Sequence, residues 1–209
     1  MKTSKTKVIV GTLLCFVPVI LGLYLWDDLP LEVPVHFDIN GNPDSYSSKA
    51  FAVFFLPALM AFINGICHFA ARFEKRTENY SKKLYELMYW LVPIMANTLC
   101  PIMLYKALGK DIRIDIFVSA FLSFIFIIIG NYLPKCKQNH SMGIKIPWTL
   151  KSEENWNKTH HLGGYIYMAT GIIGLVSSLI GAPVVFAAAL VISLVVPILY
   201  SYSLHKKGI

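Results

Sequence analysis

The sequence predicts an all-α membrane protein with six transmembrane helices, and three observations carry that prediction. Of the 209 residues, 56% are apolar and only 15% are charged, whereas about 25% are charged in soluble domains. The apolar residues gather into six runs that contain about the 20 residues needed to cross a bilayer. These runs are too long for strands and do not alternate in polarity, so we expect helices.

The six runs divide the chain into two halves of three helices. The predicted helices are Val8–Trp26, Ala50–Ala71, Leu84–Leu108, Ile114–Leu133, Leu162–Ile180 and Val184–Leu204. We expect a front half, 1–108, that carries the polar segment 27–49, and a rear half, 109–209, that carries the polar loop 134–161. The connections "GKDIR" and "GAP" are short enough to make antiparallel hairpins. Prolines within helices should kink them, and they are Pro18, Pro57, Pro93, Pro101 and Pro197.

The lysines and arginines predict the orientation. Lys2, Lys5 and Lys7 precede the first run as in a signal peptide, but the run is too long and lacks a small-residue exit. We therefore expect an uncleaved first helix. Fifteen of the 19 basic residues fall on the side of the termini and loop 134–161, which the positive-inside rule assigns to the cytoplasm. The net charge of +7 then predicts contact with membrane lipids, with no direct nucleic-acid partner.

The outer segment 27–49 predicts a short β-hairpin. Val33, Val35 and Phe37 alternate with polar residues or proline, and Asn40-Gly41 follows as a tight-turn signal. A calcium site is the alternative, because oxygen ligands recur at every second residue, at Asp38, Asn40, Asn42 and Asp44. We favour the turn, since the glycine is misplaced for an EF-hand and no bidentate glutamate follows.

Polar and small residues within the helices predict packing rather than chemistry. His68 and Glu86 lie near helix ends and are expected to pair or to reach water. The fifth helix carries a face of small residues for close helix contact, namely Thr170, Gly174, Ser178 and Ala182. The four cysteines form no CxxC pair, and neither an HExxH motif nor a Gly-rich phosphate loop is present. We expect no metal and no cofactor.

The first part of loop 134–161 predicts ordered loop rather than helix, because Gly143 and Pro147 are helix breakers. An alternating apolar set follows, with Ile144, Ile146, Trp148 and Leu150. We expect Trp148 to lie at the lipid headgroup level or to pack under the helix ends.

The second part of the loop predicts a helix that begins after Ser152, a good N-cap followed by two glutamates. Trp156 and His160 share a face of it, and Gly163-Gly164 marks its junction with the membrane helix. It is either an interfacial half-helix or a docking surface for an anionic headgroup or an acidic protein. A metal site from His140, His160 and His161 is disfavoured, because adjacent histidines point to different faces.

The motif "GNYLPK…N…GIKIPWTL.SEENW.KTHHLGG" resembles the signature of the SdpI family of bacterial membrane immunity proteins. The segment "LPLEVPVHFDINGNPDSYSSK" resembles the domain of unknown function that often precedes it. Lys145 stands where the family often has arginine, and Ile146 where it often has threonine. Lysine lacks the bidentate anion contact of arginine. The matching residues are Gly130, Asn131, Tyr132, Asn139, Gly143, Ile144, Pro147, Trp148, Thr149, Leu150, Trp156, Thr159, His160 and Gly163.

The resemblance implies a non-enzymatic membrane protein that gives resistance to a secreted peptide toxin and holds a cognate transcriptional repressor at the membrane. The partner-binding residues it implies are Asn131, Asn139, Lys145, Pro147, Trp148, Thr149, Trp156, Thr159 and His160. Candidate toxin contacts in the outer segment are His36, Asp38, Asn40 and Asp44. Two alternatives stay open: a small transporter that uses the kinked helices, or an intramembrane enzyme with Glu86, His68 or His160 as acid–base group.

Overall fold

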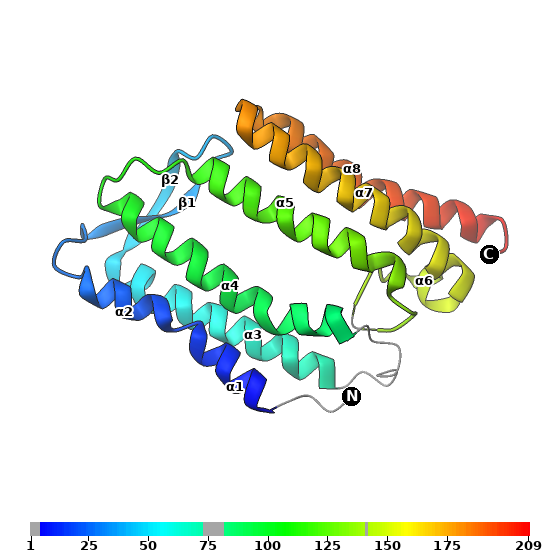
Figure 1. Ribbon diagram of the computed structural model, residues 1–209, viewed down its shortest axis with the longest axis horizontal. Helices are drawn as coiled ribbons and strands as arrows, with labels where there is room; N and C mark the ends of the chain where they lie inside the picture. Colours follow the sequence, from blue (N-terminus) through cyan, green and yellow to red (C-terminus); the bar gives the residue numbers. More distant parts are fainter. Residues whose placement is uncertain (1–4, 73–81, 141) are drawn as a thin grey trace. The chain divides into compact units, whose positions relative to one another are not determined.

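A computed structural model describes residues 5–72, 82–140 and 142–209, and it is mostly helical with one two-stranded antiparallel sheet (Figure 1). The predicted fold class is confirmed to that extent. The helices are α1 Lys5–Leu14, α2 Val17–Tyr24, α3 Leu56–Arg72, α4 Lys82–Ala107, α5 Ile114–Tyr132, α6 Pro147–Lys151, α7 Glu153–Ile180 and α8 Pro183–Lys206. The strands are β1 Glu32–Phe37 and β2 Pro43–Ser48, and two short turns of helix are η1 Phe51–Phe55 and η3 Leu133–Lys135.

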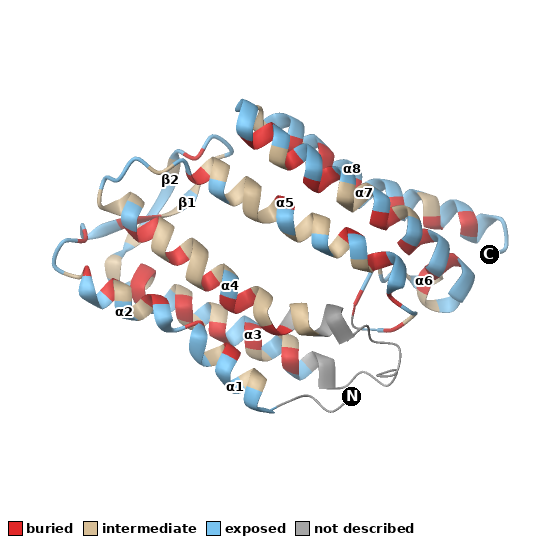
Figure 2. Ribbon diagram, in the orientation of Figure 1, coloured by how far each residue is buried: buried red, intermediate tan, exposed pale blue. Residues whose placement is uncertain are grey.

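Five helical stretches in the described part of the chain are long and apolar enough to cross a membrane. They are Lys5–Tyr24, Phe51–Phe69, Ile114–Lys135, Glu153–Ile180 and Pro183–Lys206, and they overlap five of the six predicted runs. The sixth run forms α4, a helix of 26 residues, but several of its side chains lie outside the description, so the six-span count stays a prediction. Large apolar residues are exposed on these helices, as at Leu179 (80% exposed) and Val184 (69%). Figure 2 shows exposed positions all along α7 and α8. Soluble proteins rarely expose such continuous apolar surface.

The chain divides into two compact units, which are described separately. The first holds α1 to α3, most of α4 and the β-hairpin, and the second holds α5 to α8. The chain passes from the first unit to the second after Ile114. The predicted domain boundary at residue 108 stays a prediction.

Proline breaks the first predicted helix into two. The run Val8–Trp26 was expected as one helix kinked at Pro18. It forms one spanning stretch, Lys5–Tyr24, in which α1 ends at Leu14 and α2 begins at Val17. Pro18 lies in the first turn of α2, where its missing N–H needs no partner. Pro57 follows the wider turn η1, whereas α4 and α8 continue through their internal prolines.

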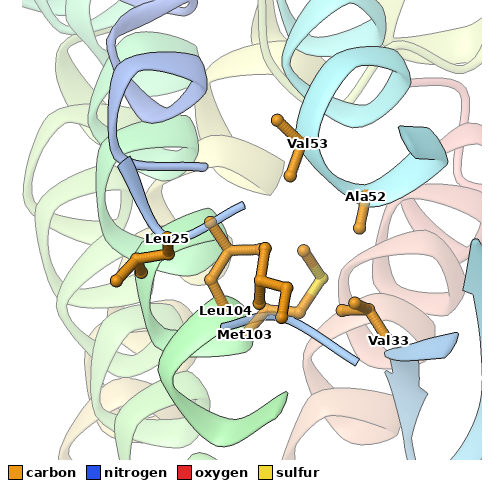
Figure 3. Close-up of a cluster of buried hydrophobic side chains, with 7 residues drawn as sticks. Leu25, Val33, Ala52, Val53, Met103 and Leu104 are labelled. Atoms are coloured by element: carbon orange, nitrogen blue, oxygen red, sulfur yellow. The ribbon is translucent and has the colours of Figure 1, made fainter. Parts of the chain in front are cut away.

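The core of the first unit fixes the hairpin to the helix ends. Val33 of β1 is fully buried and belongs to one apolar cluster with Leu25, Val53 and Leu104 (Figure 3). A Cβ on Gly22 would lie 2.5 Å from Cγ1 of Val53, so α2 can pack there only with a glycine. The hairpin therefore belongs to the folded unit.

Small residues bring the helices of the second unit into backbone contact. A Cβ on Gly171 of α7 would lie 2.5 Å from the carbonyl oxygen of Ser123 in α5. Thr170 donates a hydrogen bond to the carbonyl of Ala189 in α8 (3.4 Å). The predicted small-residue face is confirmed at the buried Thr170, Gly174 and Ser178. It is wrong at Ala182, because Gly181 ends α7 in the left-handed conformation (φ +67°) and the chain turns into α8, which packs along α7 (Figure 1).

Candidate functional site

The segment after α5 contains a helix that the sequence reading missed. Pro147 was interpreted as a breaker, yet it begins α6. Its fixed φ suits the first helical position, where an N–H is not needed. Thr149 supplies the cap, because its hydroxyl accepts from the N–H of Ile146 (3.1 Å) and donates to the carbonyl of Ile144 (2.8 Å). Ser152 then caps α7 as predicted, accepting from the N–H of Asn155 (3.2 Å).

α7 runs without interruption from Glu153 to Ile180. The predicted junction at Gly163-Gly164 is therefore wrong, because the polar half-helix and the membrane helix form one element. Gly164 has another role: a Cβ there would lie 2.5 Å from Cγ of Pro134. The glycine allows the end of α5 to approach the backbone of α7.

Trp156 and His160 form the buried centre of the segment. Their rings stack with centroids 3.9 Å apart and 17° between planes, which confirms the predicted shared face. Trp156 Nε1 donates to the carbonyl of Cys136 (2.7 Å). His160 Nε2 accepts from the N–H of Ile144 (3.0 Å), and its Nδ1 lies 2.8 Å from the Trp156 carbonyl. Because a carbonyl only accepts and an N–H only donates, the ring is neutral with its proton on Nδ1.

Gly143 is required by this arrangement. Its backbone adopts φ +110°, a conformation that residues with a Cβ rarely take. A Cβ at this position would lie 2.3 Å from Nε2 of His160. The glycine lets the backbone pass over the imidazole and present the next N–H to it.

Asn139 and Gln138 close the loop on itself. The Asn139 carbonyl oxygen accepts from the N–H of Met142 (2.7 Å), and its amide donates to the Lys137 carbonyl (2.8 Å). The Gln138 amide donates to the Thr149 carbonyl (2.7 Å). The Cys136 thiol is enclosed here, and burial raises its pKa, although a hydrogen bond from Asn139 opposes that shift. This thiol is therefore neutral and sheltered.

Asn155 joins α7 to the end of the chain, and the sequence reading missed it. Its amide donates to the carbonyls of Ser201 (3.0 Å) and Ile209 (3.2 Å). Its carbonyl oxygen accepts from the hydroxyls of Thr159 (3.1 Å) and Ser201. The only sequence signal is the spacing of four residues from Asn155 to Thr159, because the other partners, Ser201 of α8 and Ile209 beyond its end, are 46 and 54 residues away.

The nine predicted partner-binding residues fall into two groups. Five are fully buried and shape the loop: Asn139, Thr149, Trp156, Thr159 and His160. Asn131, Lys145 and Pro147 are exposed, and Trp148 is half-buried. Trp148 lies against Tyr202 and stacks on His205 (centroids 5.8 Å apart, 11° between planes), so it packs under a helix end as expected. Partner binding by this set stays a prediction.

The tip of the β1–β2 hairpin is organised by one carboxylate. Asp38 accepts from the N–H groups of Asn40 (2.9 Å) and Asn42 (2.8 Å) and from the Asn42 amide (3.2 Å). These bonds, with that from the Asn42 backbone the largest, lower the pKa of Asp38. The tight turn predicted at Asn40-Gly41 joins β1 to β2, and Gly41 alone takes positive φ (+80°) among the described tip residues.

The remaining predicted toxin contacts lie at the surface near this tip. Asn40 and Asp44 are exposed, and His36 Nδ1 lies 2.6 Å from Oδ1 of Asp44 on the facing strand. The carboxylate of Asp38 is occupied by amide donors, which favours the turn over the calcium site. No group of three or more histidine, cysteine or acidic residues could hold a metal ion among the residues that the structure describes.

Of the two alternatives predicted for His68 and Glu86, the pairing with each other is wrong, whereas Glu86 does reach the surface, with 37% of its side chain exposed. Glu86 instead accepts from Lys7 Nζ of α1. His68 stacks on Tyr89 of α4, with ring centroids 4.5 Å apart and 28° between planes. Each group thus has a partner inside the first unit, on a helix that the sequence spacing did not indicate.

Known proteins resemble this chain along nearly its whole length. Residues 135–201 match the SdpI/YfhL protein family, and residues 13–61 match a domain of unknown function, DUF1648. The Immunity protein SdpI of Bacillus subtilis (strain 168) is 24% identical over 204 residues, which cover 96% of this chain and 97% of that protein. No solved structure matches significantly. The predicted resemblance is confirmed, and with five apolar helices of spanning length the chain is a multi-pass cell membrane protein.

Proposed function

We propose that this membrane protein, whose segment 135–201 is that of the SdpI/YfhL family, is an immunity protein that makes its cell resistant to a secreted peptide toxin. One observation carries the proposal: the similarity to the Immunity protein SdpI extends from end to end of both chains. It therefore includes the outer hairpin as well as the segment around α6.

A tolerance assay tests this function. The chain is expressed in a toxin-sensitive bacterium, and the toxin concentration that halves growth is compared with that of an empty vector. We expect the tolerated concentration to rise. If the protein reaches the membrane and tolerance does not rise for any peptide toxin related to those that immunity proteins of this family counter, the proposal fails.

The proposed topology has six spans with both termini in the cytoplasm. It is supported by the bias of basic residues and by the length of α4. In a background without the four native cysteines, a membrane-impermeant maleimide should label Ser45→Cys in intact cells. It should label Lys207→Cys only after the membrane is opened. The reverse pattern would invert the topology.

A second candidate function is docking of a transcriptional repressor at the loop. The observation that favours it is the exposed basic surface beside α6, where Lys145, Pro147 and Lys151 are all exposed. Such a surface on a fixed backbone suits an acidic partner. The buried members of the predicted set then act indirectly, by holding this surface in place.

The structure changes how docking should be tested. Trp156→Ala would collapse the loop, so its loss of recruitment would be uninformative. The variant Lys145→Gln with Lys151→Gln removes charge without touching the buried network. We expect less repressor in the membrane fraction, with Lys110→Gln, an exposed lysine of the first unit, as control. Unchanged recruitment in the double variant would exclude this surface.

We infer that the protein acts without catalysis. Of the three acid–base candidates, His160 has both ring nitrogens in protein hydrogen bonds and Glu86 is paired with Lys7. Neither is positioned to exchange a proton with a substrate in this arrangement. Substrate flux in proteoliposomes would favour the transporter alternative, and turnover lost in Glu86→Gln would favour the enzyme.

A further inference from the structure

A groove of about 530 Å³ lies in the second unit where α7, α8 and the end of α5 meet. Asn157, Lys158, His161 and Tyr165 line it from α7, Tyr200 from α8, and Pro134 from η3. Its three walls come from elements that the loop network holds together.

The backbone packing explains why the groove is present. Pro134 approaches α7 closely because residue 164 is glycine, and a Cβ there would lie 2.5 Å from Cγ of the proline. The bonds from Asn155 to Ser201 and Ile209 hold the end of α8 against the same part of α7. The groove is therefore a consequence of buried contacts on both sides.

The polar end of the groove carries one lysine, Lys158, and one histidine, His161. Lys158 and Asn157 are exposed there, and His161 follows one turn later, in edge contact with Tyr165 (centroids 5.2 Å apart). Among the described residues that line the groove, none is acidic. Lys158 bonds to Glu154 on the preceding turn (2.7 Å), a surface ion pair of the kind that is weak enough for an anion to displace.

The other end of the groove is apolar and continues along the membrane helix. Leu162 and Tyr165 line it. Exposed residues on the same face of α7 follow at helical spacing, namely Ile172, Val176 and Leu179. A ligand that fits both ends has an anionic head and long apolar chains.

We propose that this groove binds an anionic phospholipid, with its phosphate at Lys158, Asn157 and His161 and an acyl chain along Tyr165, Ile172 and Val176. Lys158, with no acidic side chain among the described lining residues, favours anionic over zwitterionic headgroups, since a zwitterion brings its own cation. The aromatic side chains suit the boundary between headgroups and acyl chains. A soluble phosphate would use only the polar end.

Lipid titration followed by native mass spectrometry tests the proposal on the full chain in detergent. The probes are phosphatidylglycerol and phosphatidylcholine with identical acyl chains. We expect the wild-type protein to bind phosphatidylglycerol with about tenfold higher affinity than phosphatidylcholine. This ratio corresponds to roughly one charge-assisted hydrogen bond. Lys158→Gln with His161→Gln should lose most of that preference, and Asn157→Asp should also lower it by placing a carboxylate at the phosphate position.

The matched control removes the same residue types outside the groove, in Lys137→Gln with His140→Gln, both exposed. Equal loss of preference in this control would mean unspecific attraction to the basic surface and would overturn the proposal. So would unchanged preference in the groove variants that keep the wild-type melting temperature. Displacement of the lipid by millimolar inorganic phosphate would identify a free-anion site. Displacement by a poly-glutamate peptide would identify a protein-docking surface.

Discussion

The β1–β2 hairpin and the segment from η3 to the start of α7 are both polar intervals between apolar helices, but they are built in different ways. The hairpin tip depends on local bonds, because Asp38 bonds to residues two and four positions along the chain. The other segment depends on distant partners, such as Trp156 with Cys136 and Asn155 with Ile209. A substitution in the local turn should therefore affect only its own bonds, whereas a substitution in the buried network should disturb the bonds of its neighbours as well.

The largest effect should come from Gly143→Ala. The new Cβ would meet the His160 imidazole and force a positive-φ residue to carry a side chain. We expect a loss of about 3 kcal/mol in unfolding free energy, from the strained backbone and the broken buried bond together. The readout is the Cys136 thiol, which is buried in the wild type and should react with maleimide much faster in the variant.

Gly109→Ala is the control for that change. Gly109 also has positive φ (+76°), but a Cβ there would meet nothing within 4 Å. The variant should lose only about 1 kcal/mol of unfolding free energy, because the alanine must adopt positive φ but meets no neighbour. If both variants leave Cys136 equally protected, the clash with His160 does not decide the loop conformation.

The next effect in size concerns Asn155→Ala. It removes the partners of two backbone carbonyls and two hydroxyls at the α7–α8 contact. A destabilisation of about 2–3 kcal/mol is expected for several buried groups left unpaired. Thermal unfolding in detergent measures it, and Asn157→Ala, an exposed asparagine on the same helix, should change stability by less than about 0.5 kcal/mol. Equal melting temperatures in the two variants would contradict a structural role for Asn155.

The comparison also explains how much of the molecule the sequence could predict. The apolar helices, the hairpin, the Ser152 cap and the shared face of Trp156 and His160 were predicted because each depends on residues close in sequence. The helix α6 was missed because its cap is the Thr149 hydroxyl and proline at a first helical position looks the same as proline that ends a helix. Asn155 and the Lys7–Glu86 pair were missed because their partners lie on other helices. The sequence also did not show which of the predicted partner-binding residues are buried and which are exposed, because burial depends on distant elements as well.

A smaller, pH-dependent effect is expected in the hairpin. The folded pKa of Asp38 lies below its ordinary value of 3.8, so its ionised form stabilises the tip. That stabilisation is complete above the ordinary pKa and is lost as the pH falls through the lower, folded value. Amide exchange at Asn40 and Asn42 should therefore rise, relative to intrinsic rates, only in strong acid. In Asp38→Asn the exchange should lose this dependence, and a wild-type tip that opens at neutral pH would contradict the assignment.

The smallest effect on stability is expected at the hairpin surface, for His36→Gln with Asp44→Asn. The pair is exposed, and exposed ion pairs contribute about 0–1 kcal/mol. If the hairpin meets the toxin, tolerance should nevertheless fall clearly in this variant, while Glu32→Gln at the far end of β1 keeps it. A variant with wild-type tolerance would move the toxin contact away from the hairpin tip. Around Trp156, function and stability cannot be tested separately in this way, because the side chains there are buried and any substitution disturbs the fold itself.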